Sequence, residues 1–150
     1  MQPKIYIGSD HAGYELKEKL KAYLSVLKYE VEDCGAFTLD NDDDYTDFIQ
    51  PVAEKVAQDP ESFGIILGGS GQGEAMCANR VIGARASVYY GGTLDMITIT
   101  REHNNANILS LGARFLTEED AKQAVELFLT TKFSDEPRHL RRITKLESNN

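Results

Sequence analysis

The sequence is short of cysteine and proline, has fewer basic than acidic residues, and lacks a long apolar run. Its two cysteines, Cys34 and Cys77, lie far apart and lack the paired spacing of metal ligands. A disulfide scaffold and a cysteine-rich zinc site are therefore excluded. No apolar run approaches the roughly 20 residues of a membrane-spanning helix, so a membrane is not expected as a partner. Residues 1–4 run directly into a strand-like segment, so we expect no signal peptide and a cytoplasmic protein.

The balance of charge argues against nucleic acid as a partner. The chain carries 16 Lys and Arg against 24 Asp and Glu, which gives a net charge of −8. An acidic protein repels a polyanion, and an anionic substrate would need a local basic pocket. With 150 residues, of which 41% are apolar and 27% charged, the chain has an ordinary globular composition. We predict one domain over residues 1–150.

Short strand-like runs alternate with helical patterns along the chain. The predicted strands cover residues 4–8, 29–33, 63–67, 84–90 and 108–111. Helical patterns separate them and continue after the fifth strand to a last helix near the C-terminus. Five strands alternating with helices imply right-handed βαβ units, and hence a parallel sheet covered on both faces.

Several local signals mark where these helices begin and where loops lie. Thr117 with Asp120 forms a capping-box pattern, and Pro137 suits the first position of the last helix. We place Pro51 in the first turn of the second helix, where its missing N–H costs little. The acidic run 40–44 is expected to be a solvated loop, because like charges so close together repel one another. We expect the tail 147–150 to fray.

The unusual residues follow the predicted strands at the edge where a ligand should bind. In open parallel sheets, ligands lie beyond the carboxyl ends of the strands. Segment 8–13 follows the first strand, 68–74 the third and 112–114 the fifth, while 103–105 ends the helix before the fifth strand. Candidate site residues therefore gather at one edge of the sheet.

The segment 68–74 is a glycine-rich loop with glycines at 68, 69, 71 and 73. It is not a P-loop, because Glu74 and Ala75 follow where Lys and Ser or Thr would be required. It also fails the dinucleotide fingerprint, because a pattern started at Gly69 ends on Glu74. A tight strand-to-helix turn is the plain alternative. The density of small residues favours a nest of backbone N–H groups for an oxyanion.

Glu74 allows two interpretations. It is either a carboxylate favoured by the helix dipole or a general base directed into the nest. A base beside an oxyanion hole is the pair needed to remove a proton α to a carbonyl, because one takes the proton and the other stabilises the enolate. His11, His103 and His139, the three histidines, all fall in candidate segments or in the last helix.

Arg138 and Arg142 are spaced i, i+4 and share one face of the predicted last helix. Two guanidinium groups on one face suit a phosphate. A solvated basic helix face is the alternative, and a nucleic-acid-binding arm is disfavoured by the acidic chain.

Five segments together, in order and at family spacing, resemble ribose-5-phosphate isomerase type B. They are 9–13, 68–74, 101–106, 111–114 and 138–142. The wider family includes allose-6-phosphate and galactose-6-phosphate isomerases. The resemblance extends from about residue 5 to 142 and implies an α/β, Rossmann-like three-layer sandwich with a five-stranded parallel sheet and a C-terminal helix. It further implies a cofactor-free, metal-free aldose–ketose isomerase of carbohydrate metabolism, which is usually a homodimer with its site at the subunit interface.

The resemblance also implies roles for individual residues. Asp10 and His11 would contact the sugar phosphate, and His103 would help to open the furanose ring. Asn104 and the loop amides would hold the enediolate, and the phosphate would be bound by Arg114, Arg138 and Arg142. The catalytic residues implied are Glu74, His103 and Ser70. The implied substrate-binding residues are Asp10, His11, Gly69, Ser70, Gly71, Gly73, Asn104, Arg114, Arg138 and Arg142.

The expected base departs from the pattern of many family members. Those members carry a catalytic cysteine just before the glycine loop, where this chain has Gly68, and neither Cys34 nor Cys77 lies there. A second subgroup uses glutamate instead, and Glu74 followed by Ala78-Asn79 resembles that subgroup.

The substrate stays open among sugar phosphates. Ribose 5-phosphate, interconverted with ribulose 5-phosphate, is the leading prediction, with allose 6-phosphate, galactose 6-phosphate or a tetrose phosphate as alternatives. A non-catalytic sugar-phosphate binding module is the alternative of a different class, and the presence of both Glu74 and His103 argues against it.

Overall fold

The computed structural model describes residues 2–148, and at its centre lies a sheet of five parallel strands. The strands are β1 (Ile5–Ser9), β2 (Val31–Asp33), β3 (Phe63–Gly68), β4 (Ala86–Tyr89) and β5 (Ile108–Gly112). Their order across the sheet is β2-β1-β3-β5-β4. Ser9 lies opposite Leu67 and Gly68 lies opposite Gly112, so the carboxyl ends of β1, β3 and β5 reach the same edge.

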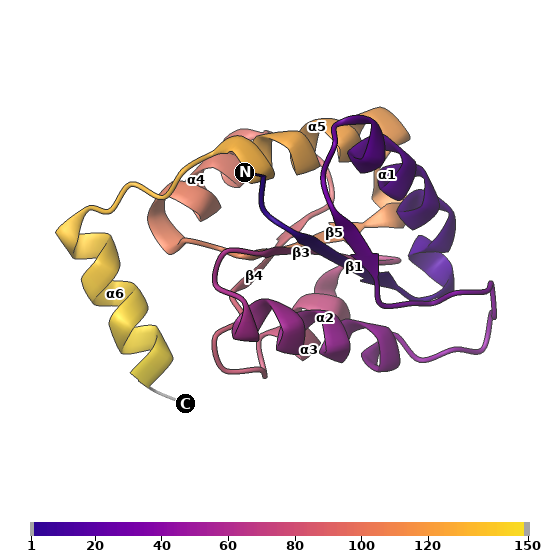
Figure 1. The fold of residues 1–150 in the computed structure, drawn as a ribbon, viewed down its shortest axis with the longest axis horizontal. Helices are drawn as coiled ribbons and strands as arrows, with labels where there is room; N and C mark the ends of the chain where they lie inside the picture. Colours follow the sequence, from indigo (N-terminus) through magenta and orange to yellow (C-terminus); the bar gives the residue numbers. More distant parts are fainter. Residues whose placement is uncertain (1, 149–150) are drawn as a thin grey trace.

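Helices cover both faces of the sheet, as the alternation of strands and helices predicts (Figure 1). They are α1 (Tyr14–Val26), α2 (Thr46–Gln58), α3 (Gln72–Ala78), α4 (Asp95–Asn104), α5 (Glu118–Thr130) and α6 (Pro137–Ser148), with short 3-10 turns η1 (His11–Gly13) and η2 (Ala113–Phe115). Helices α1, α4 and α5 pack on one face and α2 and α3 on the other. Successive residues of β3 alternate between the layers: Ile65 and Leu67 face the first, and Ile66 faces the second. The three-layer α/β fold is confirmed.

Helix α6 stands at the side of this sandwich, next to α4 (Figure 1). It begins at Pro137, as predicted, and extends to Ser148. The tail expected to fray is therefore helical as far as Ser148, and residues 149–150 lie outside the described part. The capping box of α5 is also confirmed, because Thr117 Oγ1 accepts from the Asp120 N–H while the Asp120 carboxylate accepts from the Thr117 N–H.

Two local predictions are wrong. Pro51 lies inside α2 and not in its first turn, because the helix begins at Thr46, with Ile49 N–H already bonded to the Tyr45 carbonyl. Pro51 therefore leaves the carbonyl of Asp47 without its helical donor. The acidic run is a loop, as expected, but it is not solvated throughout, since the side chain of Asp43 is only 8% exposed.

Among residues 2–148, no helix combines the length and the apolar character needed to cross a membrane.

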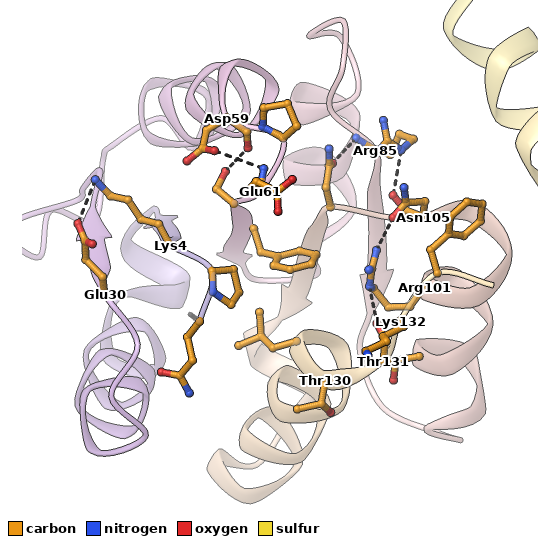
Figure 2. A pocket seen from close by; sticks show the side chains of 18 of the residues that line it. Lys4, Glu30, Asp59, Glu61, Arg85, Arg101, Asn105, Thr130, Thr131 and Lys132 are labelled. Atoms are coloured by element: carbon orange, nitrogen blue, oxygen red, sulfur yellow. Dashed lines mark hydrogen bonds and ion pairs between the residues drawn. The ribbon is translucent and has the colours of Figure 1, made fainter. Parts of the chain in front are cut away.

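A cavity of about 780 Å³ opens at the opposite edge of the sheet, where the strands begin (Figure 2). Arg101 is buried in its wall, and its Nε donates to the carbonyl of Thr131 at 3.1 Å. Its Nη1 donates to Asn105 Oδ1 at 3.0 Å and to the carbonyl of Ala106, and its guanidinium lies over the ring of Phe63. These acceptors follow the last turns of α4 and α5, so Arg101 satisfies carbonyl groups at the ends of two helices. Burial lowers the pKa of this guanidinium to about 10.

Candidate active site

A cleft of about 400 Å³ lies at the carboxyl ends of β1, β3 and β5. The first strand leads to Asp10 and His11, the third to the glycine loop and Glu74, and the fifth to Arg114. The lining residues are Asp10, His11, Ala12, Tyr45, Gly69, Ser70, Gly73, Glu74, Arg114 and Phe115. Three of the four segments that the sequence placed at this edge therefore meet in one cleft. The prediction is wrong for 103–105 within one chain, because α4 runs back across the sheet and its end, at Asn105, lines the cavity at the opposite edge.

The glycine loop is shaped by a left-handed residue and a buried hydroxyl. Gly71 has a φ of 77°, a conformation that side chains rarely adopt. Its carbonyl accepts from Ser110 Oγ at 2.7 Å. Because the C=O and N–H of one peptide point in opposite directions, this bond turns the Gln72 N–H away from Ser110, and that N–H meets Ser70 Oγ at 3.3 Å. A left-handed residue at the start of a helix is a backbone feature of anion nests, so this loop is suited to forming one.

Glu74 is buried beside this loop, with only 4% of the residue exposed. Its carboxylate occupies the space next to Gly68, where a Cβ atom would collide with Cδ and both carboxylate oxygens. Burial raises the pKa of Glu74, and the nearby charge of Asp10 adds to the shift. Backbone N–H groups of Gly71 and of Glu74 itself oppose it. A buried carboxylate with a raised pKa is suited to proton transfer near neutral pH.

His11 is held by a carboxylate from the acidic loop that the sequence did not single out. Its Nδ1 lies 2.7 Å from Asp43 Oδ1, and its backbone N–H donates to the same oxygen at 3.1 Å. The bond to Asp43 raises the pKa of His11, while desolvation opposes the change. Asp10 Oδ1 accepts from the Ala12 N–H at 3.0 Å, which fixes the carboxylate at the start of η1. The His11 ring is therefore oriented with its other nitrogen free for a ligand.

Donor atoms of Asp10, His11 and Asp43 lie within 4.8 Å of one another, a grouping that a divalent ion could use. The facing nitrogen and oxygen of His11 and Asp43 are already joined to each other, however. The arrangement therefore fits an oriented histidine better than a set of metal ligands.

Arg114 supplies a guanidinium to the cleft. The backbone N–H of Arg114 donates to the carbonyl of Gly69 at 3.1 Å. The guanidinium Nη1 lies 2.9 Å from where a Cβ atom of Gly69 would be. Tyr45 covers the far side of the loop in the same way, with its hydroxyl 2.9 Å from the Cβ position of Gly73. The sequence reasoning missed Tyr45, although its place directly after the acidic run and before a helix was a weak signal.

Five of the predicted site residues do not line this cleft: Gly71, which is buried within the glycine loop, and His103, Asn104, Arg138 and Arg142. Within one chain, His103 stacks on His139, and Asn104 lines a separate cavity of about 480 Å³ beside α6. Arg138 pairs with Glu136, with its Nε 2.9 Å from the carboxylate, and Arg142 is exposed on α6. A single chain thus gathers the predicted base, loop and one arginine, but not the histidine, the asparagine or the arginine pair.

Nearly the whole of this chain is similar to known proteins. The profile of the Ribose/Galactose Isomerase family matches residues 5–146. The chain belongs to this family. A family member named ribose-5-phosphate isomerase B, from Mycolicibacterium paratuberculosis, is 45% identical over 140 residues, which cover 93% of this chain and 87% of the relative. Another from Mycobacterium tuberculosis strain H37Rv is 44% identical, covering 93% and 85%.

Solved structures of family members have the same fold. Ribose-5-phosphate isomerase B from Mycoplasma genitalium, with bound ribulose-5-phosphate, superposes with a TM-score of 0.93 at 36% identity, covering 99% of this chain and 97% of that one. A ribose 5-phosphate isomerase from Thermotoga maritima gives a TM-score of 0.91 at 42% identity, covering 99% of both chains. The family resemblance predicted from the sequence motifs is confirmed.

Proposed function

We propose that this protein is an aldose–ketose isomerase that interconverts ribose 5-phosphate and ribulose 5-phosphate through an enediolate. The observation that carries the proposal is the buried Glu74 carboxylate, with its raised pKa, beside the glycine-loop amides. Relatives named ribose-5-phosphate isomerase B, and the one solved with ribulose-5-phosphate, support this substrate over other aldose phosphates.

The chemistry divides between ring opening and proton transfer. A furanose must lose the proton on O1 and gain one on the ring oxygen, and His103 is proposed to move both protons. Glu74 then removes the C2 proton, and the charge that develops on O1 is stabilised by loop N–H groups and by Ser70. Returning the proton to C1, as the O2 proton moves to O1, completes the ketose. Hydrogen only changes place within one molecule, so the proposed reaction consumes no oxidant, reductant or cofactor.

Binding of the substrate is assigned to both ends of the cleft. Asp10 and His11 contact the sugar phosphate, Gly69, Gly71 and Gly73 allow its close approach, and Arg114 pairs with the phosphate. In a chain of net charge −8, a dianionic phosphate needs such local cations.

We propose that a second copy of this chain completes the site with His103, Asn104, Arg138 and Arg142. These residues do not line the cleft of their own chain, which supports a role in the cleft of a partner subunit. Large apolar side chains are exposed on α3, α4 and α6, and exposed apolar surface of this kind is what another subunit would cover. They are Met76, Met96, Ile99, Leu140 and Leu146. The two cysteines, Cys34 and Cys77, are free thiols, which supports a reducing, cytoplasmic location.

The test is exchange of the C2 proton of ribose 5-phosphate with deuterated water, followed by nuclear magnetic resonance, and a coupled assay against a panel of aldose phosphates. Exchange together with formation of ribulose 5-phosphate is expected. Binding without exchange would show a sugar-phosphate binding module, and faster turnover of an allose, galactose or tetrose phosphate would reassign the substrate.

A further inference from the structure

We infer that His139 is a positioning residue that holds the imidazole of His103 in the orientation needed for ring opening. The inference rests on the proposed function of His103 and adds a residue that neither the motifs nor the family relationship assigns. Three observations on α4 and α6 carry it.

The first observation is the geometry of the two rings. Their centroids are 4.3 Å apart and their planes differ by 14°, so the faces lie flat against each other. A face-to-face contact of this kind restricts tilting of the His103 ring, because any tilt would drive its edge into the neighbouring ring. The side chain of His103 is thereby held while its nitrogens stay in the plane of the ring, where a substrate oxygen can reach them.

The second observation is that His139 is buried at a cost. Only 4% of the residue is exposed, and among the described residues its Nε2 has no hydrogen-bond partner, although the Glu136 carboxylate lies 3.9 Å away. An apolar side chain would avoid this unsatisfied nitrogen, so the planar ring serves a purpose other than stability. Burial lowers the pKa of His139, and the pKa is lowered further by His103, Arg138 and Arg142. The carboxylate of Glu136 acts in the opposite direction. An uncharged His139 places no positive charge against the ring of His103.

The third observation is that helix α6, which carries His139, is attached to the rest of the chain near both of its ends. His139 is the buried side chain of α6, whose other described residues are exposed or half-buried. The segment before α6 is tied to α4 by the Ser134 N–H, which donates to the carbonyl of Glu102 at 3.2 Å. Near the other end of α6, Glu147 pairs with Arg85 at 2.9 Å. The His139 ring is therefore fixed by its own backbone and can transmit that position to His103.

The experiment compares His139→Leu, which fills the space without a ring face, with His139→Phe, which keeps the face. Ribulose 5-phosphate cannot close a furanose ring, because its O5 is phosphorylated, so exchange of its C1 protons with deuterated water bypasses ring opening. For His139→Leu we expect conversion of ribose 5-phosphate to slow about 10-fold, the scale of losing one stacked contact, while C1 exchange from ribulose 5-phosphate stays unchanged. His139→Phe should stay within about threefold of wild type in both reactions.

A double variant decides whether the effect passes through His103. If His139 acts by positioning, His103→Asn/His139→Leu should be no slower than His103→Asn alone, whereas independent effects would multiply. Multiplied losses, equal losses in both reactions, or unchanged conversion by His139→Leu would each overturn the inference. A wild-type protein without exchange or conversion would instead refute the proposed function. Should His139→Leu fail to fold, slow conversion by His139→Phe would still contradict the proposed role.

Discussion

Replacing Gly68 by alanine tests the assignment of the base without touching the base itself. The new methyl group would lie where the Glu74 carboxylate now lies, against Cδ and both oxygens. Gly68 is in strand β3 and does not have a positive φ, so the backbone accepts alanine. The colliding atoms are the end of a flexible side chain, and Glu74 can therefore yield while the sheet stays intact.

The expected loss is large in catalysis and small in stability. A displacement of the base on the order of 1 Å costs about 100-fold in rate, and complete loss of a positioned base costs up to about 10⁴-fold. This range corresponds to roughly 2.7–5.4 kcal/mol in the barrier. The free energy of unfolding should change by no more than about 1 kcal/mol, because alanine also restricts the unfolded chain.

Gly68→Ala is assayed for turnover of ribose 5-phosphate and for urea unfolding, with Glu74→Gln and the double variant as controls. Since both single changes remove the same base, the double variant should be no slower than Glu74→Gln alone. Turnover of a folded Gly68→Ala within threefold of wild type would refute the placement of Glu74 as the base.

Four further predictions follow from the same structure. Glu74→Gln should abolish turnover and also stabilise the fold above about pH 4.3, where the carboxyl ionises in the unfolded chain while its pKa is raised in the folded one. Urea titrations at acid and neutral pH should show equal stability at low pH and a more stable variant at neutral pH; the reverse order would contradict the raised pKa. Alanine at both Cys34 and Cys77 should leave turnover unchanged, because burial raises the pKa of both thiols, that of Cys34 to about 11. A loss of activity without unfolding would show that one of the thiols takes part in the reaction. Asp43→Asn should lower the pKa of His11, measured by nuclear magnetic resonance titration, and an unchanged titration would exclude the ion pair. Arg142→Ala should raise KM by roughly one to two factors of ten. Mixing the Arg142→Ala and Glu74→Gln proteins should restore partial activity if the two residues act across subunits. No recovery of activity in proven heterodimers would show that each site is built from one chain.

The fold was predictable where the sequence carries local signals. Thr117 with Asp120 and Pro137 act through their own neighbours, and both helix starts were right. Pro51 was misplaced because α2 begins in a turn at Tyr45 that has no side-chain cap, so no local residue marks its first turn.

The cleft was predictable in outline for a topological reason. Parallel strands send the residues that follow them to one edge, which brings Asp10, Glu74 and Arg114 together whatever the intervening loops do. The contact between Asp43 and His11 spans 32 residues of sequence and depends on how a loop folds back, which no pattern in the run of aspartates encodes.

The position of β5 in the sheet has a consequence for how the chain folds as it is synthesised. In the described sheet β4 lies at one edge and pairs with β5, while β1, β2 and β3 pair among themselves. Synthesis proceeds from the N-terminus at about 5–20 residues per second, so the first three strands and the glycine loop are made before β5. The carbonyl of Gly71 receives its hydrogen bond from Ser110, which lies in β5. The glycine loop therefore lacks this hydrogen bond until β5 has been made and has joined the sheet. Glu74 and the loop are synthesised earlier, so they are present before the loop can take its final shape.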